Sequence, residues 1–293
     1  MTDAAADTWE FWSGWCHSVR PSQTLCALRE SGALPRFPEL EALVGVPQDP
    51  EWHPEGDVWV HTLLVCDAAA AIANREGLNE ADRQELLLAA LCHDLGKPAT
   101  TRFETGRWRA PGHPEAGVEP TERLLRRIQA PDSLLDNLRP LVREHLVHAQ
   151  TGMSAASIRR VLRRLQPATL PQLVRLIEAD LSGRPPLPPG LTPAVAEWVA
   201  RAEEQSRPDL VNPPPVPPPL LQGRDLIGLG HTPAVWFGEI LRECHAAQLA
   251  GEFDDEAGGI SFLQSLLQRP AKHLKEPEST NGSMAGLPTD IGN

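Results

Sequence analysis

An adjacent imidazole and carboxylate, His93 and Asp94, stand near the end of an apolar segment, LLLAALCHDLGK, that has the character of a buried helix. A carboxylate that is buried without a partner costs free energy. A divalent cation would relieve that cost, because imidazole nitrogen together with carboxylate oxygen suits transition metals. The same dipeptide also occurs without a metal, as a histidine that caps a helix beside a solvated aspartate, so the pair alone leaves both interpretations open.

Further histidines and an aspartate occur near other apolar faces or helix ends. His61 lies in an apolar segment upstream, His113 follows a loop downstream, and Asp180 falls near the end of a later segment. His145 and His148 are three residues apart, on one face of an expected helix. A single histidine of this kind is more often a core residue than a ligand. Several helices that each present one provide what a metal site inside a helical bundle requires, so we predict such a site.

The elements that must position these side chains are predicted to be helices, because the apolar spacing is helical nearly throughout. Two are strongly marked: residues 57–76, followed by Gly77, and residues 79–95, which begin at a favourable N-cap and stop at Gly96. A small hairpin is expected at 102–109, around Thr-Gly. Other helices are expected at residues 8–19, 22–31, 114–129, 132–148, 154–165, 170–182 and 192–206, with two or three short ones in 220–268.

Clusters of proline divide the chain into expected regions. We predict an N-terminal helical extension over residues 1–50, a central helical domain over 51–206 and a Pro-rich linker over 207–219. A helical region over 220–270 and a disordered tail over 271–293 follow. The predicted fold class is therefore all-α.

Composition restricts the classes of partner and location. A net charge of −12 disfavours affinity for long nucleic acid, which requires clustered Lys and Arg. The five cysteines form no CxxC pair and favour reduced thiols. The sequence shows neither a signal peptide nor a transmembrane span. We therefore expect a cytoplasmic protein without a membrane partner; its oligomeric state is left open.

The ordered series His61, His93-Asp94 and Asp180 resembles the HD superfamily of metal-dependent phosphohydrolases. The similarity is closer to the HD-bearing portion of bacterial tRNA nucleotidyltransferases and related poly(A) polymerases, and it covers roughly residues 20–268. The matching stretches are residues 53–70, 88–101, 112–117, 143–148, 157–165 and 178–186, followed by 221–230 and 237–253. The resemblance implies an HD-domain helical bundle with a small helical C-terminal extension.

The chain departs from those enzymes at its N-terminus. The nucleotidyltransferase head carries an Asp-x-Asp signature, and the roughly 50 residues before the HD region contain none. Nucleotide addition needs two metal ions held by such carboxylates. We therefore expect the phosphohydrolase function without the addition of CCA or poly(A).

The resemblance also implies roles for single residues. One metal would be held by His61, His93, Asp94 and Asp180, and Asp94 would bridge to a second metal bound by His113 and His145. The expected cofactor is one or two transition-metal ions, Mn, Ni, Co or Fe, with Mg less favoured by imidazole ligands.

Candidate substrate contacts are basic. Lys97 is equally consistent with a catalytic contact to a phosphate and with a solvent lysine at a helix end. Arg184, four residues after Asp180, is a stronger candidate, and His148 is open between a ligand, a substrate contact and a surface histidine. A helix face at residues 159–164 carries four arginines, with Arg159 and Arg163 as candidate phosphate contacts and a solvated face as the alternative.

Other residues receive weaker expectations. Glu55, Asp57 and Glu115 are candidate acceptors for ligand imidazoles, with an N-cap role as the alternative for Asp57. The eight tryptophans are expected to pack in the core or at an interface.

The leading hypothesis is a metal-dependent phosphodiesterase or phosphomonoesterase that acts on nucleotides or RNA ends, such as 2′,3′-cyclic or 2′-phosphates. One alternative is a nucleotidohydrolase for a free nucleotide. The other is a non-catalytic module that binds RNA or a partner and derives from a tRNA nucleotidyltransferase.

Overall fold

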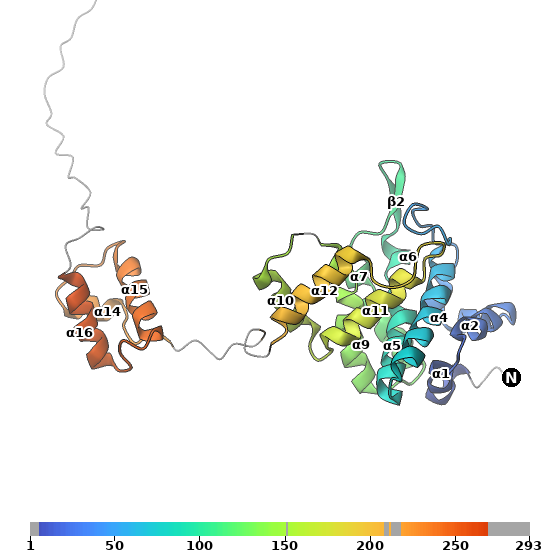
Figure 1. Ribbon diagram of the computed structural model, residues 1–293, viewed down its shortest axis with the longest axis horizontal. Coiled ribbons are helices and arrows are strands. Elements are labelled where there is room, and N and C mark those ends of the chain that lie inside the picture. Colours follow the sequence, from blue (N-terminus) through green and yellow to red (C-terminus); the bar gives the residue numbers. More distant parts are fainter. Residues whose placement is uncertain (1–5, 151, 208–210, 212–217, 269–293) are drawn as a thin grey trace, which may run out of the picture. The chain divides into compact units, whose positions relative to one another are not determined.

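The computed structural model describes residues 6–150, 152–207, 211 and 218–268. The chain forms two compact units, Met1–Pro213 and Pro214–Asn293 (Figure 1). Most of the predicted Pro-rich linker and the whole predicted tail over 271–293 lie outside the described residues.

The all-α prediction is confirmed, with one small two-stranded sheet. Within the described residues no helix combines the length and apolar character needed to cross a membrane. The elements of the larger unit are α1 (Trp9–Cys16), α2 (Pro21–Glu30), η2 (Leu34–Arg36), α3 (Pro38–Glu41), α4 (Val58–Glu76), α5 (Glu80–Cys92), α6 (Lys97–Thr100), β1 (Arg102–Glu104), β2 (Arg107–Arg109), α7 (His113–Ala116), α8 (Val118–Arg127), α9 (Asp132–Glu144), η3 (Val147–Ala149), α10 (Ala155–Leu165), α11 (Leu170–Ser182) and α12 (Pro193–Gln205).

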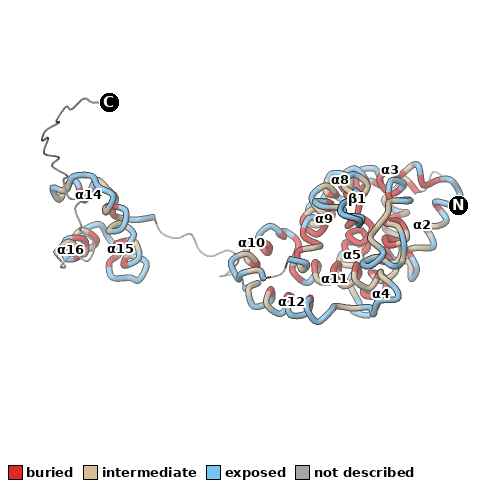
Figure 2. The backbone as a smooth tube through the Cα atoms, turned by 90° about the horizontal axis from the view of Figure 1, so that it is seen from above, coloured by how far each residue is buried: buried red, intermediate tan, exposed pale blue. Residues whose placement is uncertain are grey.

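The centre of the larger unit is built from α4, α5, α9 and α11. Helix α4 packs against α5 and α11, and α5 also packs against α9. Figure 2 shows the buried residues concentrated where these helices meet. Asp57 begins α4 by accepting a hydrogen bond from the Val60 amide, and Gly77 ends it in the left-handed conformation. Asn79 begins α5 in the same way. The two helices therefore have firm local start and stop signals.

Two predicted helices are shorter or divided in the structure, and one of them ends at a candidate ligand. The predicted helix 114–129 consists of α7 and α8, which meet at Gly117. The predicted helix 132–148 ends with α9 at Glu144, and His145 is its C-cap residue. A short 3-10 turn, η3, follows. His145 therefore lies at a helix end, where its ring can turn toward other elements.

The hairpin prediction is confirmed. Strands β1 and β2 are antiparallel and pair Phe103 with Trp108. The turn residues Thr105 and Gly106 both have positive φ, at 49° and 79°. Two successive positive φ angles are typical of a type I′ turn, whose twist matches that of the flanking strands.

Gly96 permits a close backbone approach between α6 and the turn that carries His113. A Cβ atom at Gly96 would lie 2.1 Å from the His113 carbonyl oxygen and 2.5 Å from the Gly117 nitrogen. Both are backbone atoms, which cannot move away as a flexible side chain can. Gly96 thus sets how near His113 comes to the end of α5.

We expect Gly96→Ala to lower the free energy of unfolding by about 1–3 kcal/mol, the usual cost of overpacking. Urea denaturation would measure it. Gly14→Ala is the matched control, because a Cβ atom at Gly14 meets nothing within 4 Å and alanine is the better helix former. Equal effects of the two substitutions would contradict the proposed close approach.

The smaller unit consists of α14 (Gly223–Gly228), α15 (Phe237–Leu249) and α16 (Glu256–Leu267). It has its own core, in which Leu226 and Leu263 are fully buried and Phe237 and Phe253 are largely buried. The predicted short helices of this region are thus present.

Candidate metal centre

Four side chains from three helices converge in the larger unit. His61 comes from α4, the His93-Asp94 pair follows α5, and Asp180 lies near the end of α11. His61 Nε2 lies 3.1 Å from Asp180 Oδ1, 3.3 Å from His93 Nε2 and 3.7 Å from Asp94 Oδ2. All four residues are at most 2% exposed. Nitrogen and oxygen atoms at these separations can surround one cation.

A second group shares Asp94. His113 Nε2 lies 3.2 Å from Asp94 Oδ1, and His145 Nε2 lies 4.0 Å from the same oxygen. The two imidazoles are 3.3 Å apart, measured between their Nε2 atoms. Asp94 thus directs Oδ2 toward the first group and Oδ1 toward the second. The arrangement offers one bridging carboxylate between two candidate positions for a cation.

Backbone carbonyl groups hold the histidine rings in one orientation. The Nδ1 atoms of His93, His113 and His145 lie 2.6–2.8 Å from the carbonyl oxygens of the residues three positions earlier. Because a carbonyl only accepts, each Nδ1 donates its proton there. In the neutral ring Nε2 then carries a lone pair, and it points into the cluster. This arrangement is characteristic of metal-binding histidines.

The carboxylates of the cluster are held in their ionised form. Burial alone would raise the pKa of Asp94, but His93 and Lys97 hold it well below its ordinary value. Burial acts in the same way on Asp180, and Arg184 and His61 hold the pKa of Asp180 well below its ordinary value. Burial lowers the pKa of His145 to about 3, so its ring is neutral.

The donor set fits a divalent transition metal. Two buried carboxylates and several imidazole nitrogens face one another at 3–4 Å, and Asp94 Oδ2 lies 2.8 Å from the Lys97 ammonium group. Lone pairs so close together repel one another unless a cation lies between them. Histidine and aspartate ligands together suit Mn, Fe, Co, Ni or Zn, whereas Mg prefers ligands that are all oxygen atoms.

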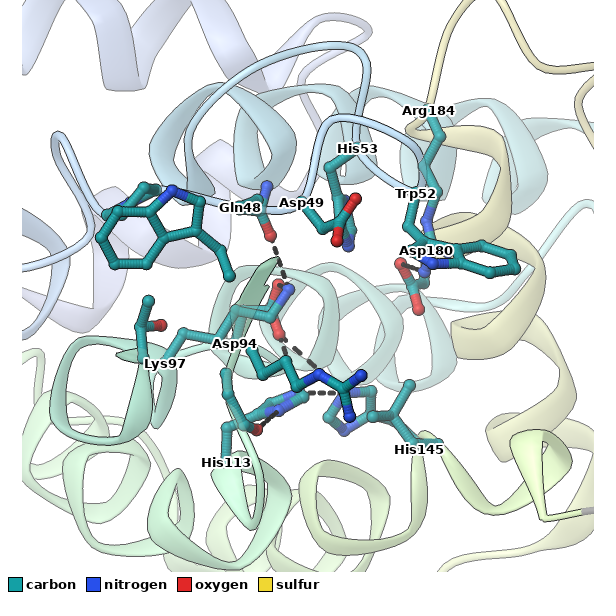
Figure 3. Close-up of a pocket in the computed structure, with 16 residues that line it drawn as sticks. Gln48, Asp49, Trp52, His53, Asp94, Lys97, His113, His145, Asp180 and Arg184 are labelled. Carbon is teal, nitrogen blue, oxygen red and sulfur yellow. Dashed lines mark hydrogen bonds and ion pairs between the residues drawn. The ribbon is translucent and has the colours of Figure 1, made fainter. Parts of the chain in front are cut away.

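A cavity of about 230 Å³ opens beside this cluster (Figure 3). Asp94, His113, His145 and Asp180 line it. Lys97 and Arg184 line it too, and both are directed at the carboxylates: Lys97 Nζ lies 2.8 Å from Asp94 Oδ2, and Arg184 Nη2 lies 2.5 Å from Asp180 Oδ1. The cavity therefore combines the candidate ligands with two cationic side chains.

The structure excludes one of the two interpretations of Lys97. It also places Arg159 and Arg163 away from the cavity. Lys97 is 8% exposed and cannot be a solvent lysine. Arg159 and Arg163 do not line the cavity; they donate hydrogen bonds to Gln205 Oε1 and the Val211 carbonyl. Their predicted contact with a phosphate finds no geometric support at this site.

His148 also lies outside the residues that line the cavity. Its Nδ1 is 3.1 Å from the His145 carbonyl oxygen, and burial lowers its pKa. It is half-buried, and its hydrogen bond reaches the backbone of His145 rather than the imidazole of this candidate ligand.

The three candidate acceptors separate into different roles. Glu55 Oε1 lies 2.7 Å from His61 Nδ1, close but off the line of a hydrogen bond, and 2.8 Å from His53 Nδ1. Asp57 caps α4. Glu115 is exposed and pairs with Arg143, so the expectation that it accepts from a ligand imidazole is wrong.

Sequence reasoning missed several residues of the cavity. His53, Gln48 and Asp49 line it, and Gln48 accepts a hydrogen bond from Lys97. Trp52 and Trp108 line it as well and are exposed, so the expectation of core packing is wrong for these two. The loop before α4 carried no periodic signal from which its approach to the cluster could be read.

We expect Glu55→Gln to weaken metal affinity about 10- to 100-fold, the usual effect of removing an outer partner of a ligand histidine. The loss of charge removes the attraction that holds His61 Nδ1. Competition with a chelating indicator would measure the affinity. Glu115→Gln is the matched control at an exposed site. Equal metal affinities of the two variants would show that Glu55 does not support His61 as a metal ligand.

Comparison with known proteins finds a similar family model. Residues 58–180 match the model of the HD domain. The candidate ligands from His61 to Asp180 fall within the segment that resembles the HD domain.

Similar proteins include several multifunctional CCA proteins. That of Cupriavidus metallidurans is 35% identical over 182 residues, which cover 60% of this chain and 42% of the relative. That of Burkholderia pseudomallei is 37% identical over 172 residues, 57% of this chain and 39% of the relative. That of Halorhodospira halophila is 38% identical over 166 residues, which cover 56% of this chain and 34% of the relative. The chain spans less than half the length of these relatives.

Proposed function

We propose that this protein is a metal-dependent phosphohydrolase that acts on nucleotides or RNA ends, such as 2′,3′-cyclic or 2′-phosphates. The observation that carries the proposal is the buried donor set, in which Asp94 faces two groups of imidazoles beside an open cavity. The HD domain and the resemblance to tRNA nucleotidyltransferases favour a phosphate ester of nucleotide type. A cytoplasmic location is part of the same proposal.

His61, His93, Asp94 and Asp180 would hold one ion, and Asp94, His113 and His145 would hold a second. Mn, Ni, Co or Fe are the proposed metals, with Mg less favoured. When bound, the metal would supply Lewis-acid polarisation of a phosphoryl oxygen and activation of water at neutral pH.

The chain's own residues would bind and orient the phosphate. Lys97 is a compact point charge at the cavity wall, and Arg184 offers a planar guanidinium that suits phosphate oxygens. Arg184 Nε is buried without a hydrogen-bond partner and is thus a donor that a ligand would satisfy. Gln48 accepts a hydrogen bond from Lys97, and Asp180 accepts one from Arg184, so both cations are held at the cavity.

A hydrolysis screen tests the proposal. Protein stripped of metal and reloaded with Mn²⁺, Ni²⁺, Co²⁺ or Fe²⁺ would be given 2′,3′-cyclic AMP, 2′-AMP and 3′-AMP, with Mg²⁺ for comparison. We expect metal-dependent release of a phosphomonoester or of inorganic phosphate from at least one of them. The absence of hydrolysis with every ion would contradict the proposed enzymatic activity. It would favour the alternative of a non-catalytic module that binds RNA or a partner.

A second comparison separates RNA ends from free nucleotides. The same cyclic phosphate would be presented on a mononucleotide and at the 3′ end of an oligonucleotide. A preference for the oligonucleotide supports a role at RNA ends, whereas activity on the mononucleotide alone supports the nucleotidohydrolase. The net charge of −12 favours contact with only a short end of RNA.

A further inference from the structure

Exposed aromatic side chains are gathered at one place in the described part of the chain. Three aromatic residues are exposed there: Trp52 and Phe103, each 58%, and Trp108, 37%. Trp52 and Trp108 line the cavity beside the candidate metal ligands, and Figure 3 shows Trp52 near Asp180 and Arg184. Phe103 packs edge-on against Trp108, with ring centroids 5.2 Å apart. All three therefore belong to the neighbourhood of one cavity.

The β-hairpin presents Trp108 in a defined position. Phe103 and Trp108 are cross-strand partners, so each side chain supports the other on the same face. Neither ring is covered by the core of the larger unit. The hairpin thus holds an indole ring in solvent at the wall of the cavity.

An ion pair joins the hairpin to the loop that carries Trp52. Arg107 Nε lies 2.5 Å from Asp49 Oδ2, and the arginine also contacts Glu51. The carbonyl of Asp49 accepts hydrogen bonds from the amides of Trp52 and His53, at 3.1 and 2.8 Å. The ion pair therefore joins the loop to the hairpin, and we name Trp52 and Trp108, which line the same cavity, the Trp52–Trp108 rim.

The chemistry of the rim matches a nucleobase. Exposed aromatic rings are platforms for stacking, which every base accepts because every base has a π face. The same cavity presents Lys97, Arg109 and Arg184, whose charges suit phosphate oxygens. A phosphate ester without an aromatic group would leave the rings in water. A nucleoside phosphate would use both the cations and the rings.

We propose that the Trp52–Trp108 rim stacks on the base of a substrate whose phosphate lies at the His-Asp cluster, so that the site selects nucleoside phosphates over phosphate esters that lack a base. This inference rests on the proposed function, because it assumes that the phosphate reacts at the cluster.

The first test compares two substrates. Trp108→Ala and Trp52→Ala would be assayed with 2′-AMP and with glycerol 2-phosphate, which has no base. We expect the ratio of kcat/KM for 2′-AMP to kcat/KM for glycerol 2-phosphate to fall about 5- to 150-fold, the loss of one base–aromatic stack. The loss should lie mainly in KM for 2′-AMP, and Trp108→Phe should retain much of the ratio.

Val19→Ala is the control, because Val19 is an apolar side chain, 74% exposed, that does not line the cavity. It should keep the wild-type ratio. A wild-type ratio in both tryptophan variants would overturn the proposal. So would a fall of equal size in Val19→Ala.

A second test does not depend on hydrolysis. In chelator-treated protein, 2′-AMP should quench tryptophan emission and glycerol 2-phosphate should not. The quenching should be lost in the double variant Trp52→Phe, Trp108→Phe. Quenching that persists in this variant overturns the rim even if hydrolysis is observed. Quenching that is lost in it, together with no hydrolysis of any substrate, supports the rim and contradicts the proposed function.

Discussion

Replacement of Asp94 by asparagine is expected to lower kcat/KM for phosphate-ester hydrolysis about 1,000-fold or more. Asp94 faces both imidazole groups, through Oδ2 to His93 and through Oδ1 to His113. The neutral amide keeps the size of the side chain but removes the charge that attracts a cation. A metal's contribution to such a reaction is several kcal/mol, and each factor of ten corresponds to about 1.4 kcal/mol.

The matched control is Asp136→Asn. Asp136 is an exposed aspartate that pairs with Arg139 on the surface, so its substitution should leave the rate near that of the wild type. Circular dichroism would establish that both variants keep their helical content. Wild-type activity in a folded Asp94→Asn protein would mean that the reaction does not depend on this cluster.

Removal of bound metal by a chelator is expected to lower the melting temperature by roughly 8–16 °C. A ligand that binds only the folded state at about 1,000 times its dissociation constant stabilises it by about 4 kcal/mol. One kcal/mol corresponds to roughly 2–4 °C in a domain of this size. The physical reason is that the buried donors lose the charge that offsets their mutual repulsion.

The same measurement on His93→Ala supplies the comparison. This variant lacks one candidate ligand of the first group, so the difference between its metal-loaded and chelated melting temperatures should be much smaller. A difference as large as that of the wild type would place the stabilising ion outside the first group. Differential scanning calorimetry would measure the melting temperature of each protein with and without metal, so that each variant serves as its own reference.

Helices with strong local signals were predicted well from the sequence. The N-caps Asp57 and Asn79 and the terminal Gly77 mark α4 and α5 by short-range chemistry alone. The type I′ turn of the hairpin is likewise a local feature. The end of α9 at Glu144 was missed, because the chain leaves the helical conformation at Leu146, just after His145, in a tertiary setting that the periodicity of the sequence does not indicate.

The candidate ligands were predicted from an ordered series of residue types, and the structure brings those side chains together. The surrounding cavity was not predicted, because its wall comes from an irregular loop and a hairpin rather than from periodic helices. Gln48 and Trp52 approach the cluster through long-range contacts that leave no repeating pattern in the sequence. The arginines at 159 and 163 show the reverse case, in which a clear charge pattern lies away from the cavity.

The most direct test of the account is an anomalous difference map from crystals loaded with Mn²⁺. The account predicts a strong peak within coordinating distance of His61 Nε2, His93 Nε2, Asp94 Oδ2 and Asp180 Oδ1, and its disappearance in crystals of Asp94→Asn. A map from fully loaded crystals with no peak at these atoms would contradict the account.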